Sequence, residues 1–123
     1  MNAAYPTSAT PAADADSQWS TLCVVATTVD SEDSAQALAR LLVGERAAAC
    51  VQVEPIVSHY VWQAEPRRTS EWRLVCKTMP DALPWLTALL RRHHGYEVPQ
   101  ITMRTERCLA DYAGWVAGQV VSK

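Results

Sequence analysis

The chain has 123 residues, of which 49% are hydrophobic and 20% are charged, the proportions of an ordinary globular domain. Its formal net charge is −2 and it contains no basic run, which argues against nucleic acid as a partner. No apolar run approaches the roughly 20 residues of a membrane span. The N-terminus lacks the basic and apolar segments of a signal peptide, so we expect a cytoplasmic protein.

The cysteines are spread widely along the chain, and no two of them form a Cys-x-x-Cys pair. In a reducing compartment, such cysteines are expected to be buried free thiols and not a disulfide framework. They are Cys23, Cys50, Cys76 and Cys108.

The N-terminal segment, residues 1–19, consists mainly of small and polar residues and has no hydrophobic period. This composition predicts a disordered tail and leaves residues 20–123 as a single domain. Residues 21–28 form a short run that is apolar and rich in β-branched residues. Such a run is typical of a central strand buried on both faces.

A helix is expected directly after this strand. Asp30 or Ser31 is the expected N-cap, and Glu32 and Asp33 suit the positive end of the helix dipole. Apolar residues then recur at spacings i, i+3, i+4 and i+7, which predicts one buried stripe. They are Ala35, Leu38, Ala39 and Leu42.

A long second strand is predicted over residues 50–63, where an extended pattern is interrupted by Pro55. A proline inside a strand is typical of a sheet edge or a bulge, so this strand should be bent and peripheral. Alternation places Tyr60 and Trp62 on one face and His59 on the other.

The rest of the chain predicts a hairpin tip at residues 65–68, a returning strand over residues 71–78 and a helix that begins near Asp81. A fourth strand is predicted over residues 99–105 and a last helix over residues 111–121. The inner stripe of the middle helix is expected to consist of Leu86, Leu89, Leu90 and His93.

This order of elements predicts an α+β fold, a ferredoxin-like split βαβ sandwich with an antiparallel sheet in the order 4-1-3-2 and an extra C-terminal helix. The topology places all four cysteines at one end of the sheet. The loop at residues 93–95 lies at the other end, beside residues 27–30. We therefore expect no cysteine of the same subunit to reach a metal held by this loop.

Five ordered segments between residues 21 and 121 stand out together. They are Ala48-Ala49-Cys50-Val51, Ser58-His59-Tyr60-Val61-Trp62, Lys77-Thr78, Tyr96-Glu97-Val98-Pro99, and Asp111-Tyr112 with Trp115. With these segments the chain resembles the CutA family of divalent-cation tolerance proteins. This resemblance implies a cytoplasmic homotrimer of ferredoxin-like subunits, without a defined catalytic activity, that takes part in tolerance of and response to copper and other divalent metal ions.

The resemblance also implies a copper site at two adjacent histidines, His93 and His94, together with a cysteine at the end of the first strand. The corresponding position here is Thr27, which is not a thiolate. Two imidazoles alone suit Cu(II), Zn or Ni, whereas a thiolate favours Cu(I). No cofactor is required, and a divalent metal, Cu or Zn, is one candidate ligand beside a small molecule. The alternatives are that His93 is a packed core residue and that the pair is a helix C-cap.

The segment around these histidines is also a candidate ligand cleft between subunits of the trimer. Tyr96, Glu97 and Lys77 are its candidate lining residues, and Tyr60 and Trp62 are candidates for the trimer interface, because an apolar edge strand should not end in water. Two further hypotheses remain. One is a PII-like sensor of a small anion or a scaffold for a protein partner. The other is an enzyme with His, Tyr and Glu as acid and base.

Overall fold

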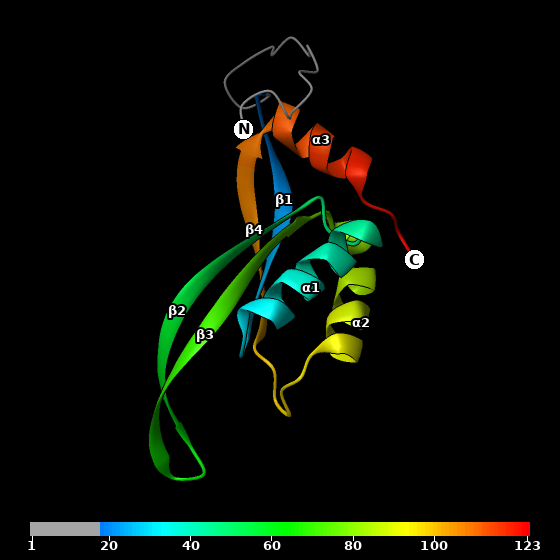
Figure 1. Ribbon diagram of the computed structural model, residues 1–123. Coiled ribbons are helices and arrows are strands. Elements are labelled where there is room, and N and C mark those ends of the chain that lie inside the picture. Colours follow the sequence, from blue (N-terminus) through cyan, green and yellow to red (C-terminus); the bar gives the residue numbers. More distant parts are fainter. Residues whose placement is uncertain (1–17) are drawn as a thin grey trace.

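Residues 18–123, the part of the chain that this computed structural model describes, form a sheet of four strands with three α-helices (Figure 1). The expected tail lies outside these residues except for its last two, and Trp19 is the first residue of β1. In chain order the elements are β1 (Trp19–Val29), α1 (Glu32–Gly44), β2 (Cys50–Trp62), β3 (Glu65–Thr78), the short 3-10 helix η2 (Pro80–Ala82), α2 (Leu83–His93), β4 (Ile101–Leu109) and α3 (Ala110–Gln119).

The sheet has the strand order β2-β3-β1-β4 with antiparallel pairing throughout. This order is the predicted 4-1-3-2 read from the other edge, so the ferredoxin-like prediction is confirmed. The central position of β1 explains its composition, because residues 22–29 are all buried. A strand that is covered on both faces needs apolar side chains at successive positions and not only at alternate ones.

The two faces of β1 are covered by different helices. Val25 and Val29 pack in one core cluster with the buried residues of α1 and α2. Leu22 and Val24, which point to the opposite face, pack with Val116 of α3. The C-terminal helix therefore covers one end of the face that α1 and α2 leave open.

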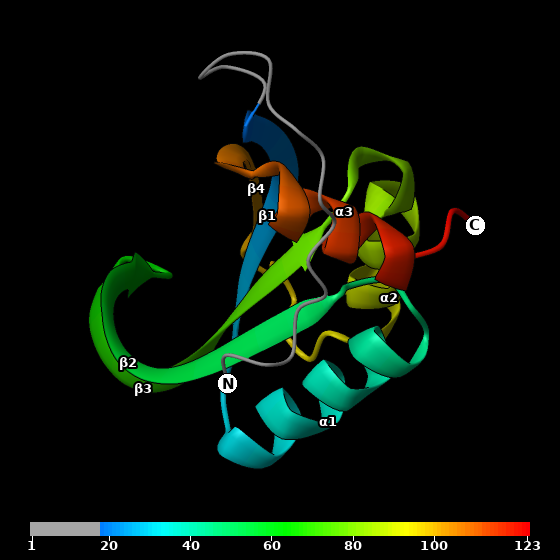
Figure 2. The ribbon, with the colours of Figure 1, turned by 90° about the horizontal axis from the view of Figure 1, so that it is seen from above.

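The β2–β3 hairpin projects from the sheet and curls strongly, as Figure 2 shows. β2 is an edge strand, as expected, but the predicted tip at residues 65–68 is wrong. These residues belong to β3, and the turn consists of Gln63 and Ala64 with φ of 53° and 64°. A two-residue turn of this hand needs both residues in the left-handed region, which Asn and Gly usually supply. Gln and Ala give no such signal.

The helix boundaries follow local capping chemistry. Ser31 is the N-cap of α1, and its hydroxyl accepts a hydrogen bond of 3.1 Å from the amide of Ser34. The helical segment predicted to begin near Asp81 starts as the 3-10 turn Pro80–Ala82, and α2 continues directly from it at Leu83. Within residues 18–123, no helix has the length and apolar character needed to span a bilayer.

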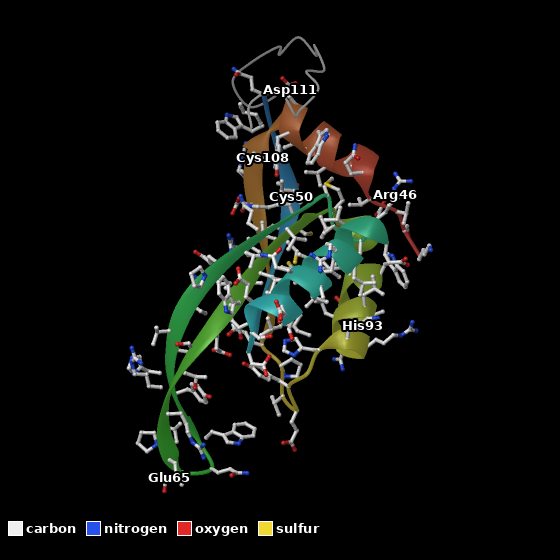
Figure 3. The ribbon with its side chains drawn as sticks, viewed as in Figure 1. Arg46, Cys50, Glu65, His93, Cys108 and Asp111 are labelled. Carbon is white, nitrogen blue, oxygen red and sulfur yellow. The ribbon has the colours of Figure 1, made fainter. Side chains whose placement is uncertain are left out.

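The four cysteines are free thiols, as predicted, although only Cys23 and Cys76 are fully buried. Burial raises the pKa of the Cys76 thiol to about 12. Figure 3 shows Cys50 and Cys108 towards α3, above His93, which lies at the lower end of α2. Cys50 and Cys108 are thus separated from the loop after α2, as predicted. Cys23 and Cys76 are not at that end of the sheet, because Cys23 and Val25, the strand partner of Cys76, flank the midpoint of β1.

Candidate functional site

A cavity of about 500 Å³ lies where the curled hairpin approaches the loop between α2 and β4. Its volume is within the range of small-molecule sites, roughly 300–1,000 Å³. The end of β1, the outer part of the hairpin and the loop all contribute to it. Its lining residues are Thr28, Ser58, His59, Tyr60, Trp62, Glu71, Tyr96, Glu97, Val98 and Gln100.

The loop and the hairpin are joined by a hydrogen bond between Tyr96 and Glu71. The Tyr96 hydroxyl donates to Oε2 of Glu71 at 2.6 Å, and only 7% of Glu71 is exposed. Burial raises the pKa of Tyr96, and the hydrogen bond to the Glu71 carboxylate raises it further. The tyrosine therefore stays a neutral donor and fixes the position of the carboxylate at the cavity wall.

Tyr60 and Trp62 form the hairpin side of the cavity while remaining substantially exposed. Their exposed fractions are 44% and 40%, large values for aromatic residues on a strand. The Tyr60 hydroxyl also shares a hydrogen bond of 2.9 Å with the hydroxyl of Thr69 on β3. The structure thus brings these two residues together with Tyr96 and Glu97, as parts of one cavity.

Lys77 is not brought to this cavity. It lies on β3, and its Nζ reaches across β1 to within 3.6 Å of Oε1 of Glu106 on β4. Arg104 makes a second ion pair with the same carboxylate at 3.2 Å. In the single chain, Lys77 is therefore part of a charge network and not a lining residue.

His94 uses both ring nitrogens to hold the loop against β1. Its Nδ1 accepts a hydrogen bond of 3.1 Å from the amide of Tyr96, and its Nε2 is 3.0 Å from the hydroxyl of Thr27. Because an accepting Nδ1 carries no proton, a neutral ring donates from Nε2 to Thr27. Thr27, the position that the resemblance matched to a thiolate, is thus in direct contact with His94.

His93 does not belong to the buried stripe of α2, so that prediction is wrong. It is exposed in the last turn of the helix, and the buried residues of α2 are Leu86, Leu89 and Leu90. His93 and His94 instead line a smaller cavity of about 120 Å³ that also includes Asp30.

The geometry around the two histidines does not form a ready metal chelate. A metal on His94 would displace one of its two hydrogen bonds, and stable protein sites usually have three or four ligands. In the described part of the chain, no three His, Cys, Asp or Glu side chains lie close enough to share a metal ion. Metal binding by this pair stays a prediction.

Several lining residues were not identified from the sequence, and Glu71 is the charged one among them. The sequence placed Glu71 only as the first residue of a predicted strand. The only sequence signal for Glu71 is strand alternation. Leu74 and Cys76 pack in the core with α1 and α2, so Glu71 is on the opposite face of the sheet. Neither a local motif nor a periodicity could show that the loop at Tyr96 would fold back onto this carboxylate.

The fold and the cavity define a ferredoxin-like α+β domain with a ligand-sized cleft beside its projecting hairpin. Residues 23–119 match the family described as CutA1 divalent ion tolerance protein, and the chain belongs to this family. It is 43% identical over 79 residues to the divalent-cation tolerance protein CutA of Thermus thermophilus, a match that covers 63% of this chain and 77% of that protein.

Solved structures show the same fold. CutA from Synechococcus elongatus PCC7942 superposes with a TM-score of 0.79 and 32% identity, over 82% of this chain and 91% of that one. A structure described as PII-like protein CutA from Nostoc sp. PCC 7120 in apo form has a TM-score of 0.77 and 27% identity, over 82% of this chain and 99% of that one.

Proposed function

We propose that the protein is a homotrimeric, non-catalytic member of the divalent-cation tolerance family that acts in the cytoplasm and binds a metal or small ligand at clefts between subunits. Membership of the family supports a role in metal tolerance. The observation that carries the ligand-binding part is the cavity of about 500 Å³, whose wall includes Tyr60, Trp62, Tyr96 and Glu97.

The trimer is supported by surface that a single chain leaves open. β2 is a 13-residue edge strand, and the exposed large apolar residues of the hairpin include Val57, Val61 and Trp62. Long apolar edges are usually covered, because their unpaired backbone groups recruit other strands. Light scattering on the purified protein should therefore return three times the chain mass of 13.6 kDa. A mass equal to one chain would contradict the proposal.

The metal-binding part of the proposal is that copper or zinc binds at His93 and His94. Calorimetric titration of Cu(II), Cu(I) and Zn(II) should show binding to the wild-type protein that is lost in the double variant His93→Ala/His94→Ala. His59→Ala is the matched control, since it removes the remaining histidine. Unchanged binding in the double variant would remove the histidines from the proposal.

A PII-like sensor of small anions is the less favoured alternative. The cavity is lined by two carboxylates, Glu71 and Glu97, and by no Lys or Arg. Anions are stabilised by cationic groups and by helix N-termini. The lining therefore favours a neutral or positively charged ligand.

A further inference from the structure

The cavity beside the hairpin combines carboxylates with an aromatic wall. Glu71 and Glu97 line it together with the rings of Tyr60, Trp62 and Tyr96. A cation is attracted both to a carboxylate and to the faces of aromatic rings. We propose that this cavity binds a small organic ammonium ion, with its charged group at Glu71 and its hydrocarbon part beside Tyr60 and Trp62.

Glu71 is the main reason for assigning a cation. Burial of a carboxylate is unfavourable unless an opposite charge or several hydrogen bonds compensate for it. Glu71 is 7% exposed and accepts a hydrogen bond from the neutral Tyr96 hydroxyl, yet no ion pair within residues 18–123 includes it. A buried carboxylate without a cation, at the wall of an open cavity, is suited to receive one from a ligand.

The basic residues nearest along the strands do not supply this charge. Arg73, two residues beyond Glu71 on β3, is paired with Glu54, with 2.8 Å between Nε and Oε1. Arg67 lies opposite Tyr60 in the strand pairing but is not among the lining residues. The negative charge of the cavity therefore remains available.

The size and the donors of the cavity favour an organic cation over a bare metal ion. A metal ion needs several ligand atoms close together, and the described residues offer no group of three acidic, histidine or cysteine side chains. A volume of about 500 Å³ leaves space for an alkyl chain. Aromatic walls stabilise that chain by excluding water from it.

This inference rests on the proposed ligand-binding cleft and adds the chemical class of the ligand. Its probe is n-butylammonium chloride, with butan-1-ol and butyrate as neutral and anionic probes of the same chain length. The assembled wild-type protein is titrated by calorimetry in a chelator-treated buffer, and the indole N–H resonance of Trp62 is followed in parallel. We expect saturable binding and a shift of that resonance with butylammonium alone.

The variant Glu71→Gln keeps the size of the side chain and an acceptor for Tyr96 but removes the charge. We expect butylammonium affinity to fall about tenfold or more, because a hydrogen bond to a charged partner is lost. The matched control is Glu45→Gln, which removes an exposed carboxylate outside the cavity and should leave the affinity unchanged. Tyr60→Leu, at an exposed position, provides a second variant that does not disturb the buried carboxylate and should weaken binding of butylammonium.

Equal binding of butan-1-ol, preferential binding of butyrate, or full affinity in Glu71→Gln would overturn the proposal. The absence of butylammonium binding to the assembled protein would also overturn the proposal. The same result is expected if a Lys or Arg of a second copy fills the cavity. Failure of the trimer or of metal binding is measured separately, by light scattering and by metal titration. The experiments can therefore reject the ammonium site without rejecting the proposed function, and they can reject the proposed function without rejecting the ammonium site.

Discussion

Arg46, two residues after the end of α1, binds the C-terminal end of α3 through Gln119. Its Nε donates to the carbonyl of Gln119 at 3.0 Å, and its Nη2 donates to the carbonyl of Gly118 at 3.1 Å. Figure 3 shows Arg46 beside the C-terminal segment of the chain. The last carbonyls of a helix lack partners within the helix, and a cation there also opposes the negative end of the dipole.

Replacing Arg46 by Ala should therefore lower the free energy of unfolding by about 1 kcal/mol. Arg46→Gly should cost less than Arg46→Ala, since Arg46 has φ of 57° and only glycine adopts this conformation without strain. Urea unfolding at a fixed protein concentration measures both values, and hydrogen exchange should rise in α3. Equal stability of the Ala variant and the wild type would contradict the role of this contact.

The hairpin turn offers a stabilising substitution. Ala64 has φ of 64°, so Ala64→Gly should raise the free energy of unfolding by roughly 0.5–1 kcal/mol. Ala88→Gly in the exposed middle of α2 is the matched control and should lower it by about 1 kcal/mol. Thermal unfolding of both variants shows whether each substitution raises or lowers the free energy of unfolding. A loss of stability in Ala64→Gly would show that the turn relaxes in solution.

Thr27→Cys should place a thiolate beside His94, as the resemblance led us to expect for this position. The side chain of Thr27 already contacts Nε2 of His94 at 3.0 Å, and a sulfur there would give one soft and one imidazole ligand. We expect Cu(I) affinity to rise at least about tenfold in competition with a chromogenic chelator. Thr27→Ser should show no gain, and the gain should disappear in Thr27→Cys/His94→Ala.

The stability of the protein at alkaline pH should depend on Tyr96. Because burial and then the hydrogen bond to Glu71 raise its pKa in the folded state, its contribution is fully present below the unfolded-state pKa of about 10. Above that value the unfolded state releases the proton first, so the contribution falls as pH rises toward the folded-state pKa. Tyr96→Phe should lose stability less steeply than the wild type between about pH 9 and about pH 11.5. Parallel stability curves for the two proteins would contradict this assignment.

The architecture could be predicted because its main signals are local. A run of apolar residues such as 22–29 is compatible with a central strand, and the order of strands and helices then leaves few topologies. The position of Ser31 before an acidic first turn likewise marks the start of α1. Each of these patterns arises within a single element.

The site was predicted only in part, because it depends on how separate elements meet. Tyr96 and Glu97 were identified as lining residues, but Glu71 was not, since the loop reaches it across 25 positions of sequence. His93 was placed on the inner stripe of α2 by its spacing, whereas the buried part of that helix ends at Leu90. Spacing gives the direction of a side chain but not the point at which the neighbouring core ends.

Tyr60 and Trp62 of the projecting hairpin line the cavity and are also exposed to solvent. Any molecule that packs on their exposed surface restricts the rings that form the cavity wall. Occupancy of the cavity and coverage of the hairpin are then linked equilibria, and each must change the affinity of the other by the same factor. A cleft ligand would thereby act as a thermodynamic effector of assembly, and assembly as an effector of ligand binding.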